Sequence, residues 1–364
     1  MSKRVLCAMS GGVDSSVVAA LLVQQGYEVI GVTMKLWKGE DDPFAAHRFG
    51  GCCTIGAVED ARRVADQLGI PYYVMNLQRE FEAAVVDDFV SEYAKGRTPN
   101  PCARCNEFIK FHTFLERATE LDCEFIATGH YAQIERDADK STFVLKRGLD
   151  QKKDQSYVLG MLTQDELARV LLPIGGMEKT ETRRLAEEFG FCVAKKPDSQ
   201  EICFVEDGDY AKFVEDRVPE LAVAGPILDQ DGEQLGEHKG LAHYTVGQRK
   251  GLGIAAATPL FVTKIDTEKG AVIVGQREAL RCNGFRVTKA KWTAEKLEPN
   301  TPVLAQTRAH GSVTAAKVLE VDDDSFTLRF DEPQLGIAPG QMCVLYQGDE
   351  VRGAGTIDVT IVPD

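Results

Sequence analysis

Up to about residue 130, short apolar runs alternate with longer stretches in which apolar residues recur every three or four positions. Residues 5–9 form an apolar run of the kind found in strands buried on both faces. The stretch at residues 14–25 has helical character, and Gly26 follows it at a position where helices commonly end. Further strands are expected at residues 28–34, 71–75 and 125–128, and further helices at residues 57–68, 81–93 and 107–121. Strands separated by helices predict a parallel sheet covered on both faces.

The pattern changes twice further along the chain. Residues 154–218 are mainly helical, with the clearest helix at residues 180–189. After Pro219, glycine and short alternating strands dominate, and strands are expected at residues 225–229, 234–238, 260–265, 271–275, 303–308, 314–319, 326–330 and 342–346. The later strands are spaced as in a small β-barrel. We therefore predict an α/β parallel-sheet domain over residues 1–218, a mainly-β central domain over residues 219–283 and a C-terminal β-barrel over residues 284–364.

Length and composition support a folded protein of several domains. The chain has 364 residues, of which 44% are hydrophobic, enough to build buried cores. It contains no apolar run near the roughly 20 residues that span a bilayer, and its first residues lack the pattern of a signal peptide. We therefore expect a cytoplasmic protein without a membrane partner, whose ten cysteines are reduced thiols.

The charge of the chain limits how it can bind nucleic acid. A formal net charge of −14 argues against non-specific binding, which depends on a strongly positive surface, and no DNA partner is expected. Residues 277–317 nevertheless hold eight Lys or Arg and three Glu. The acidity therefore lies elsewhere, and this segment is either a local basic patch for RNA or an ordinary solvated face.

A glycine-rich segment follows the first predicted strand. Residues 10–16 read Ser-Gly-Gly-Val-Asp-Ser-Ser and open the first predicted helix. Glycines let the backbone turn sharply, and the amide groups at a helix N-terminus favour an anion. The Lys-Ser/Thr ending of a Walker loop is absent. A glycine-rich turn capped by Asp14 is the simpler alternative.

This segment resembles the phosphate loop of the PP-loop ATP pyrophosphatases, the adenine nucleotide alpha hydrolase-like enzymes that cleave ATP between its α and β phosphates. The resemblance implies ATP as cofactor. An aspartate among phosphate oxygens also requires a bridging cation, so Mg²⁺ is expected beside Asp14. Because ligands of parallel sheets bind at the carboxyl ends of strands, residues that end other strands join the loop. The expected ATP contacts are Ala8, Met9, Ser10, Gly11, Gly12, Val13, Asp14, Ser15, Ser16, Met34 and Gly129.

Two cysteines have surroundings that favour a reactive thiolate. Cys105 lies beside Arg104 and just before the helix predicted from residue 107, and Cys203 follows a pair of lysines. Cys102 and Cys105 could instead be half of a zinc site completed by Cys52 and Cys53, although adjacent cysteines fit such a site poorly. The remaining cysteines are expected to be small buried side chains: Cys7, Cys123, Cys192, Cys282 and Cys343.

Taken together, the motifs resemble those of the bacterial tRNA-specific 2-thiouridylases over nearly the full chain. The matching segments, in order, are MSGGVDSSV, GVTMKLW, DARRVADQLGIPYYV, GRTPNPC, ATGHYA, LKRGLD, KDQSYVL, AKKPDSQEICF, HYTVGQRKGLGI and APGQ. The resemblance implies that ATP adenylates C2 of the wobble uridine in tRNAs of the Lys, Glu and Gln type. A sulfur nucleophile then replaces the oxygen, and AMP and pyrophosphate are released.

The resemblance also assigns roles to residues. It implies that Cys203 carries a persulfide received from a sulfur-relay protein and that Cys105 is the partner thiol that releases the sulfur or closes a disulfide. It places Asn100, Pro101 and Cys102 at the target base. Contacts to tRNA are expected from His130, Lys153, Asp154, Gln155, Arg308 and Gln341.

Cys102 is a departure from the family pattern, because many members carry Asp at this position. Cys102, Cys105 and Cys203 could hold a [4Fe–4S] cluster with one open iron. Persulfide chemistry needs only the last two, and we favour it.

Three other functions compete with this interpretation. A PP-loop synthetase acting on a small molecule would share the ATP loop without needing paired cysteines, and a tRNA 4-thiouridine enzyme would differ only in its target. A non-enzymatic RNA-binding or metal-binding module is disfavoured by the intact loop at residues 10–16.

Overall fold

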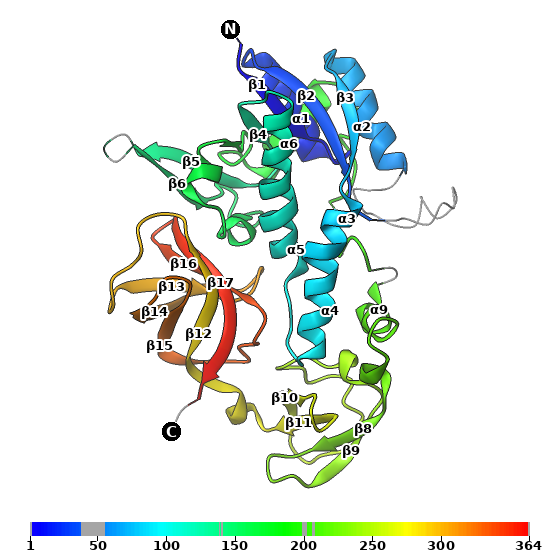
Figure 1. The fold of residues 1–364 in the computed structure, drawn as a ribbon, viewed down its shortest axis with the longest axis vertical. Coiled ribbons are helices and arrows are strands. Elements are labelled where there is room, and N and C mark those ends of the chain that lie inside the picture. Colours follow the sequence, from blue (N-terminus) through cyan, green and yellow to red (C-terminus); the bar gives the residue numbers. More distant parts are fainter. Residues whose placement is uncertain are drawn as a thin grey trace. The chain divides into compact units, whose positions relative to one another are not determined.

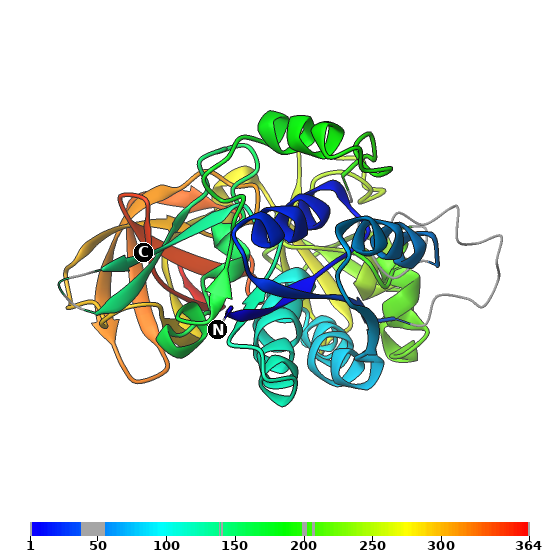
Figure 2. The same ribbon diagram turned by 90° about the horizontal axis from the view of Figure 1, so that it is seen from above.

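The structure is a computed structural model that describes residues 2–37, 55–137, 139, 141–198, 202–205 and 208–362. The chain forms two compact units (Figures 1 and 2). Unit 1 comprises Met1–Val85, Cys102–Glu206 and Asp349–Val351, and unit 2 comprises Val86–Pro101, Asp207–Gly348 and Arg352–Asp364. Within the described ranges, no helix is long and apolar enough to cross a membrane.

Unit 1 is built on a parallel sheet with the strand order β3-β2-β1-β4-β7. Its strands are β1 (Arg4–Ala8), β2 (Glu28–Lys35), β3 (Tyr72–Asn76), β4 (Phe125–Ala127) and β7 (Val170–Leu171). Val5 of β1 pairs with Val29 of β2 on one side and with Phe125 of β4 on the other. The predicted parallel sheet is confirmed, with β7 as an additional two-residue strand that is too short to leave a sequence pattern.

Helices cover both faces of this sheet. Figure 2 shows α1 (Val13–Gln24) and α2 (Ile55–Leu68), in blue, on one face and α6 (Phe114–Glu120), in teal, on the other. Helix α8 (Lys179–Glu188) packs on α1, which explains why α1 is buried nearly all round rather than amphipathic. The core between α1, α2 and the sheet includes the fully buried Val17, Val18 and Val64.

Other elements of unit 1 were not expected from the pattern. The hairpin of β5 (Ala132–Asp137) and β6 (Thr142–Arg147) is antiparallel and begins five residues after β4. Its strands carry charges on their exposed faces, and the sequence therefore lacks a long apolar run there. The shorter helices and turns of the chain are α3 (Gln78–Phe81), Glu82–Val86, α4 (Asp87–Ala94), α5 (Pro101–Arg104), Cys105–Thr113, Ser156–Leu159, α7 (Gln164–Leu167), α9 (Tyr210–Glu215), Pro219–Ala222, Leu241–His243 and Arg277–Leu280.

The strand-rich part of unit 2 begins with a four-stranded sheet. Its strands, β8 (Gly225–Leu228), β9 (Gln234–His238), β10 (Phe261–Asp266) and β11 (Ala271–Gly275), match the predicted positions. They are arranged in the order β10-β11-β8-β9. The connection between the antiparallel strands β10 and β11 is a hairpin.

A closed antiparallel barrel of six strands completes unit 2. The strands are β12 (Arg281–Trp292), β13 (Pro302–Gln306), β14 (Thr314–Val321), β15 (Phe326–Leu335), β16 (Met342–Gln347) and β17 (Glu350–Ile361), and pairing of β12 with β17 closes the barrel. The barrel was predicted without β12 and β17. Glycines interrupt β17 because its backbone runs close to β12: a Cβ on Gly355 would lie 2.5 Å from a methyl carbon of Val287.

Candidate active site

The phosphate loop joins β1 to α1 and cannot accept a side chain at Gly11. This residue has a φ of +68°, and a Cβ there would lie 2.1 Å from the carbonyl oxygen of Ala57 in α2. Gly12 occupies the N-cap of α1 in an extended conformation, without a capping side chain. Because Gly12 has no side chain to accept from the first amide groups of α1, a phosphate is a suitable partner for these amides.

The serines of the phosphate loop stabilise its conformation through hydrogen bonds within the loop. Ser16 is fully buried, and its hydroxyl donates to the Gly12 carbonyl at 2.8 Å. Ser15 Oγ accepts from the Ser10 amide at 3.1 Å and lies 3.3 Å from the Ser10 hydroxyl. Of the three hydroxyls expected to meet phosphate, only that of the exposed Ser10 lies at the surface.

Asp14 is bound by a cation of the protein itself. The Lys179 ammonium lies 2.8 and 2.7 Å from its two carboxylate oxygens, and the Tyr131 hydroxyl donates to one of them at 2.8 Å. Burial, together with the Asp14 charge, raises the pKa of Tyr131 far above its usual value, so this hydroxyl stays protonated. In the structure, the cation bound by Asp14 is therefore the Lys179 ammonium.

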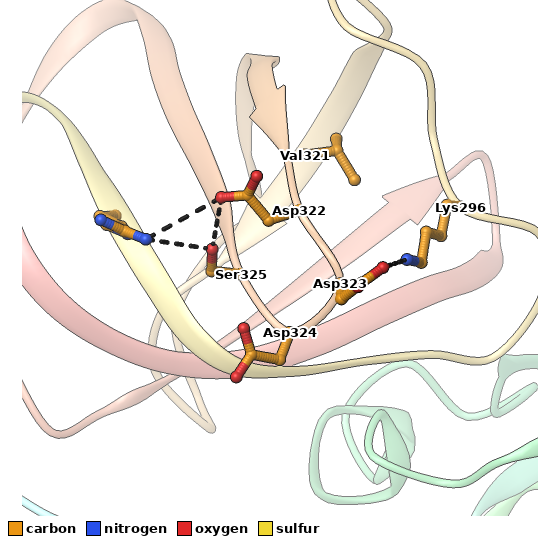
Figure 3. Close-up of a pocket in the computed structure, with 7 residues that line it drawn as sticks. Lys296, Val321, Asp322, Asp323, Asp324 and Ser325 are labelled. Atoms are coloured by element: carbon orange, nitrogen blue, oxygen red, sulfur yellow. Dashed lines mark hydrogen bonds and ion pairs between the residues drawn. The ribbon is translucent and has the colours of Figure 1, made fainter.

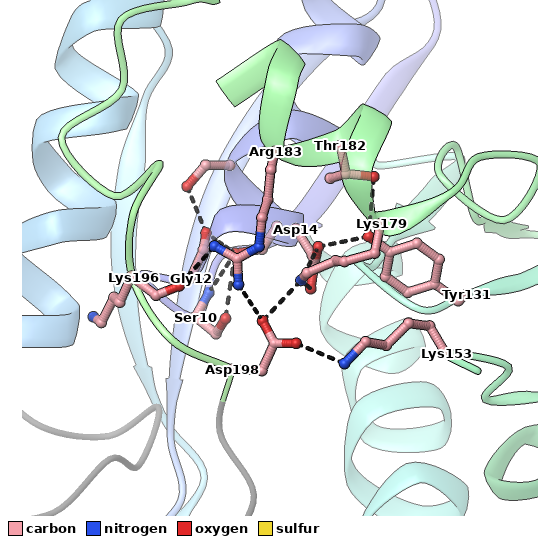
Figure 4. Close-up of polar contacts among 12 residues, drawn as sticks. Ser10, Gly12, Asp14, Tyr131, Lys153, Lys179, Thr182, Arg183, Lys196 and Asp198 are labelled. Atoms are coloured by element: carbon pink, nitrogen blue, oxygen red, sulfur yellow. Dashed lines mark hydrogen bonds and ion pairs between the residues drawn. The ribbon is translucent and has the colours of Figure 1, made fainter. Parts of the chain in front are cut away.

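A second carboxylate, that of Asp198, gathers three cations beside the loop (Figure 4). Lys153 Nζ lies 2.9 Å from Oδ2, while Arg183 Nη2 and Lys179 Nζ lie 2.9 and 3.0 Å from Oδ1. Partial burial opposes ionisation of Asp198, but the hydrogen bonds from Lys153 and Lys179 prevail and lower its pKa to about 2. Lys179 therefore joins the two carboxylates, Asp14 and Asp198.

The chain just before Asp198 is hydrogen-bonded to α8, to the phosphate loop and to α2. Arg183 Nη1 donates to the carbonyls of Ala194 and Lys196 at 3.3 and 3.0 Å. Lys196 Nζ donates to the Gly11 carbonyl and to Asp60, both at 3.0 Å. We call residues 194–198 the docked segment.

The remaining expected ATP contacts lie at the carboxyl ends of neighbouring strands. Ala8 ends β1, and Met34 lies near the end of β2. The Met9 carbonyl accepts from Thr33 Oγ1 at 2.5 Å. Gly129 follows β4 and passes so close to α1 that a Cβ would lie 3.0 Å from the Ser15 nitrogen. A side chain at this position would therefore force α1 or the loop to shift slightly.

The structure corrects the expected position of Cys105. The helix begins at Pro101 rather than at residue 107, because proline suits a first helical position, where its missing N–H costs nothing. Cys105 therefore lies past the first turn and is buried, whereas the exposed Cys102 lies within that turn. Arg104, expected to favour the thiolate, bonds to Glu107 at 3.0 Å inside the protein.

Cys203 lies at the surface beside an aromatic anchor. It is exposed, while the next residue, Phe204, is 2% exposed. The ring of Phe204 packs against those of Trp37 and Phe81, with centroids 5.9 and 5.6 Å away. Trp37 therefore serves in packing.

The cysteines that the structure describes do not form a ready-made metal centre. Among the residues that the structure describes, no three His, Cys, Asp or Glu side chains are grouped to hold a metal ion. This arrangement of Cys102, Cys105 and Cys203 does not fit a cluster held by three thiolates. Cys52 and Cys53, the suggested zinc partners, lie outside the described residues.

His130, an expected tRNA contact, is buried. Its Nδ1 lies 2.8 Å from the Thr128 hydroxyl, and its ring packs on Phe111 at 5.6 Å between centroids. Burial, with a contribution from Lys110, lowers the pKa of His130 to about 3, so the ring is neutral at physiological pH.

The three consecutive residues Lys153, Asp154 and Gln155 have contacts within the protein. Asp154 accepts from the amides of Gly148 and Ser156, at 2.9 and 3.0 Å. Gln155 accepts from the Tyr131 amide at 3.0 Å and donates its own amide to the Tyr131 carbonyl at 2.9 Å. Because Tyr131 bonds to Asp14, this turn supports the phosphate loop.

Gln341 holds the loop that leads to Asn100 and Pro101. In unit 2, its Nε2 donates to the carbonyls of Thr98 and Pro99 at 2.9 and 3.2 Å. Arg97, just before this loop, bonds to Asp358 of β17 at 2.7 Å. Gln341 therefore fixes the course of the segment expected at the target base.

The basic residues of the barrel are only partly available to RNA. Arg308 is exposed, although one of its nitrogens donates to the Gly336 carbonyl at 2.6 Å. A polar pocket of about 540 Å³ is lined by Arg286, Lys296 and the residues 321–325 (Figure 3). Within it, Lys296 pairs with Asp323 at 2.8 Å, which reduces the positive charge of the predicted basic segment.

Sequence patterns alone did not reveal the cation cluster. Tyr131 and Asp198 stand within quoted motifs, ATGHYA and AKKPDSQEICF, but Lys179 and Arg183 lie on a helix whose charges look like a solvated face. Their function follows from the packing of α8 against α1, which no local pattern indicates.

The sheet, the glycine-rich loop at the end of β1 and the surrounding cations define an α/β enzyme domain of the PP-loop class, followed by a β-rich central part and a β-barrel. Comparisons support and refine this class. The matching family models are described as tRNA methyl transferase HUP domain for residues 3–207, tRNA methyl transferase PRC-barrel domain for residues 211–276 and aminomethyltransferase beta-barrel domain for residues 282–357.

Full-length relatives carry a more specific name. The chain is 49% identical over 364 residues to the tRNA-specific 2-thiouridylase MnmA of Symbiobacterium thermophilum, covering 99% of this chain and 93% of the relative. It is 48% identical to that of Geobacter metallireducens and 47% identical to that of Natranaerobius thermophilus, covering 99% and 98% of this chain and 98% of each relative. The chain belongs to the family of tRNA-specific 2-thiouridylases.

Replacing Gly11 by alanine tests the loop. The Ala57 carbonyl stands 2.1 Å from the new Cβ, so the loop must shift. We expect pyrophosphate release from ATP and tRNA to fall about 100-fold, as for other small misplacements of reacting groups. Gly26→Ala is the matched control, because Gly26 also has a positive φ but nothing lies within 4 Å of its Cβ position. Equal activities of the two variants would refute the steric argument.

The buried ring of His130 makes the free energy of unfolding depend on pH. Its pKa is about 3 in the folded chain and 6.5 in the unfolded chain, so protons bind the unfolded chain first. The contribution of the neutral His130 ring to the free energy of unfolding is complete above pH 6.5. It is lost as pH falls towards 3, by about 1.4 kcal/mol per pH unit. His130→Asn should remove this slope from urea unfolding followed by Trp37 fluorescence in a Trp292→Phe background. The exposed His310→Asn should keep it, and an unchanged slope in His130→Asn would contradict the account.

Proposed function

We propose that this enzyme is an ATP-dependent tRNA-uridine 2-sulfurtransferase that replaces the C2 oxygen of the wobble uridine in tRNAs of the Lys, Glu and Gln type. Membership of the 2-thiouridylase family supports the target. The observation that carries the ATP-dependent step is the phosphate loop with Lys179, Lys153 and Arg183 beside it. These cations suit the polyphosphate of ATP and stabilise pyrophosphate as it leaves.

In the first step, the uracil C2 oxygen attacks the α-phosphorus of ATP, and pyrophosphate departs. The expected ATP contacts are those at residues 8–16, together with Met34 and Gly129. Mg²⁺ would be held mainly by the phosphates of ATP, because this ion takes phosphates and waters as most of its ligands and needs only one or two carboxylates. Asp14 is the carboxylate of the loop that would hold this ion, in place of its ion pair with Lys179.

In the second step, the outer sulfur of a persulfide on Cys203 attacks C2, and AMP leaves. The exposed position of Cys203 supports loading by a sulfur-relay protein. The Cys105 thiolate then attacks the inner sulfur, so that a transient disulfide forms and the thiolated base is released. A reductant restores the two thiols. The ungrouped cysteines favour this route over the [4Fe–4S] alternative.

The side chains expected at tRNA fall into two groups, those proposed to contact the RNA and those proposed to position other segments of the protein. Asn100, Pro101 and Cys102 are proposed to meet the base, and Arg308 the RNA backbone. Gln341 and Gln155 act by positioning the segments that they bond, since both are engaged within the protein. Direct contact by His130 requires its ring to leave a buried site. The domain boundaries 1–218, 219–283 and 284–364 and the cytoplasmic location stay predictions.

Three alanine variants distinguish the sulfur chemistries. Cys105→Ala and Cys203→Ala should abolish thiolation of a tRNA transcript by persulfide-loaded enzyme, while ATP binding is retained. Cys102→Ala should keep part of the activity, because Cys102 lies outside the persulfide exchange. The measurements are single-turnover formation of 2-thiouridine, AMP and pyrophosphate, with iron and labile sulfide content of anaerobically purified protein. Stoichiometric iron, lost with activity in all three variants, would contradict the persulfide route, and ADP as product would contradict the PP-loop chemistry.

A further inference from the structure

The segment that is proposed to meet the target base has little structure of its own. Residues 97–100 lie in neither a helix nor a strand, and α5 begins only at Pro101. Residues 98–101 read Thr-Pro-Asn-Pro, and since proline has no N–H, only Thr98 and Asn100 carry backbone donors. We call residues 98–101 the target-base loop. With few donors and no regular structure, this loop depends on neighbouring groups of the protein for its course.

One end of the barrel holds the target-base loop through its backbone. The Thr98 amide donates to the Pro339 carbonyl at 2.9 Å. Gln341 donates to the carbonyls of Thr98 and Pro99, as described above. Gly340 passes so close that a Cβ there would lie 2.9 Å from the Thr98 carbonyl oxygen. Residues 339–341 therefore contact the loop closely at its first two positions.

Arg97 anchors the loop where it begins. Its Nη1 donates to Asp358 at 2.7 Å and its Nη2 to the Ile357 carbonyl at 3.0 Å, both on β17. Its Nε lies 2.7 Å from the carboxylate of Glu92, near the end of α4. The side chains of Arg97 and Glu92 are only 20% and 9% exposed, so salt screens this ion pair less than a surface pair. Arg97 therefore joins α4, the start of the loop and β17.

The contacts of Arg97 favour a role in positioning over a role in binding RNA. Each of the three guanidinium nitrogens has a partner within the protein. Lys95 also pairs with Glu92, at 3.1 Å, so two cations face the two carboxylates of Glu92 and Asp358. The charges of this group balance, and little positive potential is left to attract an RNA phosphate. Arginine suits such a junction because its planar fork bonds several partners at once, which lysine cannot do.

We propose that Arg97 is a positioning residue for thiolation, which fixes the target-base loop on β17 and thereby orients the uridine that the loop contacts. This inference rests on the proposed function and deepens it. Adenylation requires the uracil C2 oxygen to lie in line with the α-phosphorus of ATP, and a misplacement of about 1 Å can cost about 100-fold in rate. The last strand of the barrel therefore contributes to the rate of the reaction, separately from any contact of the barrel with RNA.

Arg97→Ala tests this assignment in the full chain with a tRNA transcript of the Lys type. At saturating tRNA, the single-turnover rates of pyrophosphate release and 2-thiouridine formation should fall about 100-fold. The Kd for tRNA should be unchanged, because Arg97 has no partner on the RNA. Arg97→Lys keeps the charge but reaches fewer partners, so it should recover part of the lost rate. An unchanged rate with weaker tRNA binding, whose salt dependence falls by about one ion, would show a phosphate contact and overturn the proposal.

A matched control removes the other cation of the same carboxylate. Lys95 pairs with Glu92, but its side chain is 58% exposed and the pair does not involve β17. Exposed ion pairs contribute little. Lys95→Ala should therefore react and bind tRNA like the wild type. A rate as low as that of Arg97→Ala would show that any change at Glu92 slows the reaction, and would overturn the specific role of Arg97.

Asp358→Asn examines the same junction from the side of β17. It should lower the same rates, and adding Arg97→Ala should cause no further loss, because both residues act through one contact. Losses that multiply in the double variant would overturn the proposal. If Arg97→Ala fails to fold, Arg97→Lys and Asp358→Asn carry the same test. Wild-type enzyme that forms no 2-thiouridine would refute the proposed function, whereas wild-type rates in Arg97→Ala would refute only this inference.

Discussion

The position of one ammonium group, that of Lys179, organises the functional half of unit 1. Its side chain is only 10% exposed and lies between the carboxylates of Asp14 and Asp198. A buried cation needs such partners, because leaving it unpaired would carry a desolvation penalty of several kcal/mol. The same contacts tie α8 to α1 and to the docked segment. The charge arrangement that suits ATP is therefore also the arrangement that holds these three parts of the chain together.

This double role explains several otherwise separate features. Tyr131 keeps its proton beside Asp14, and Gln155 holds the Tyr131 backbone on both sides. Lys153, expected to contact tRNA, joins Lys179 and Arg183 around the Asp198 carboxylate.

Much of the fold could be predicted from the chain because its signals are local. The apolar run of β1, the glycine after α1 and the alternation of β10 and β11 each lie within a dozen residues. The elements that were missed depend on distant partners. β17 carries glycines because β12 passes close to it, and β7 has two residues and exists only through pairing with β4.

In the candidate site, too, residues with a local role could be predicted and residues that depend on distant partners could not. The loop at residues 10–16 could be recognised because its glycines serve a local turn, and Gly11 is sterically required. Cys105 was expected just before its helix, whereas the helix begins four residues ahead of it, at Pro101. Lys179 and Arg183 could not be assigned, since their partners lie on other segments, Asp14 and Asp198.

Mass analysis of tRNA nucleosides tests the central claim most directly. Cells that lack this protein should lose 2-thiouridine derivatives from the wobble position, and a plasmid copy of the gene should restore them while 4-thiouridine stays unchanged throughout. Undiminished 2-thiouridine in the deleted cells, or a loss of 4-thiouridine in its place, would contradict the account.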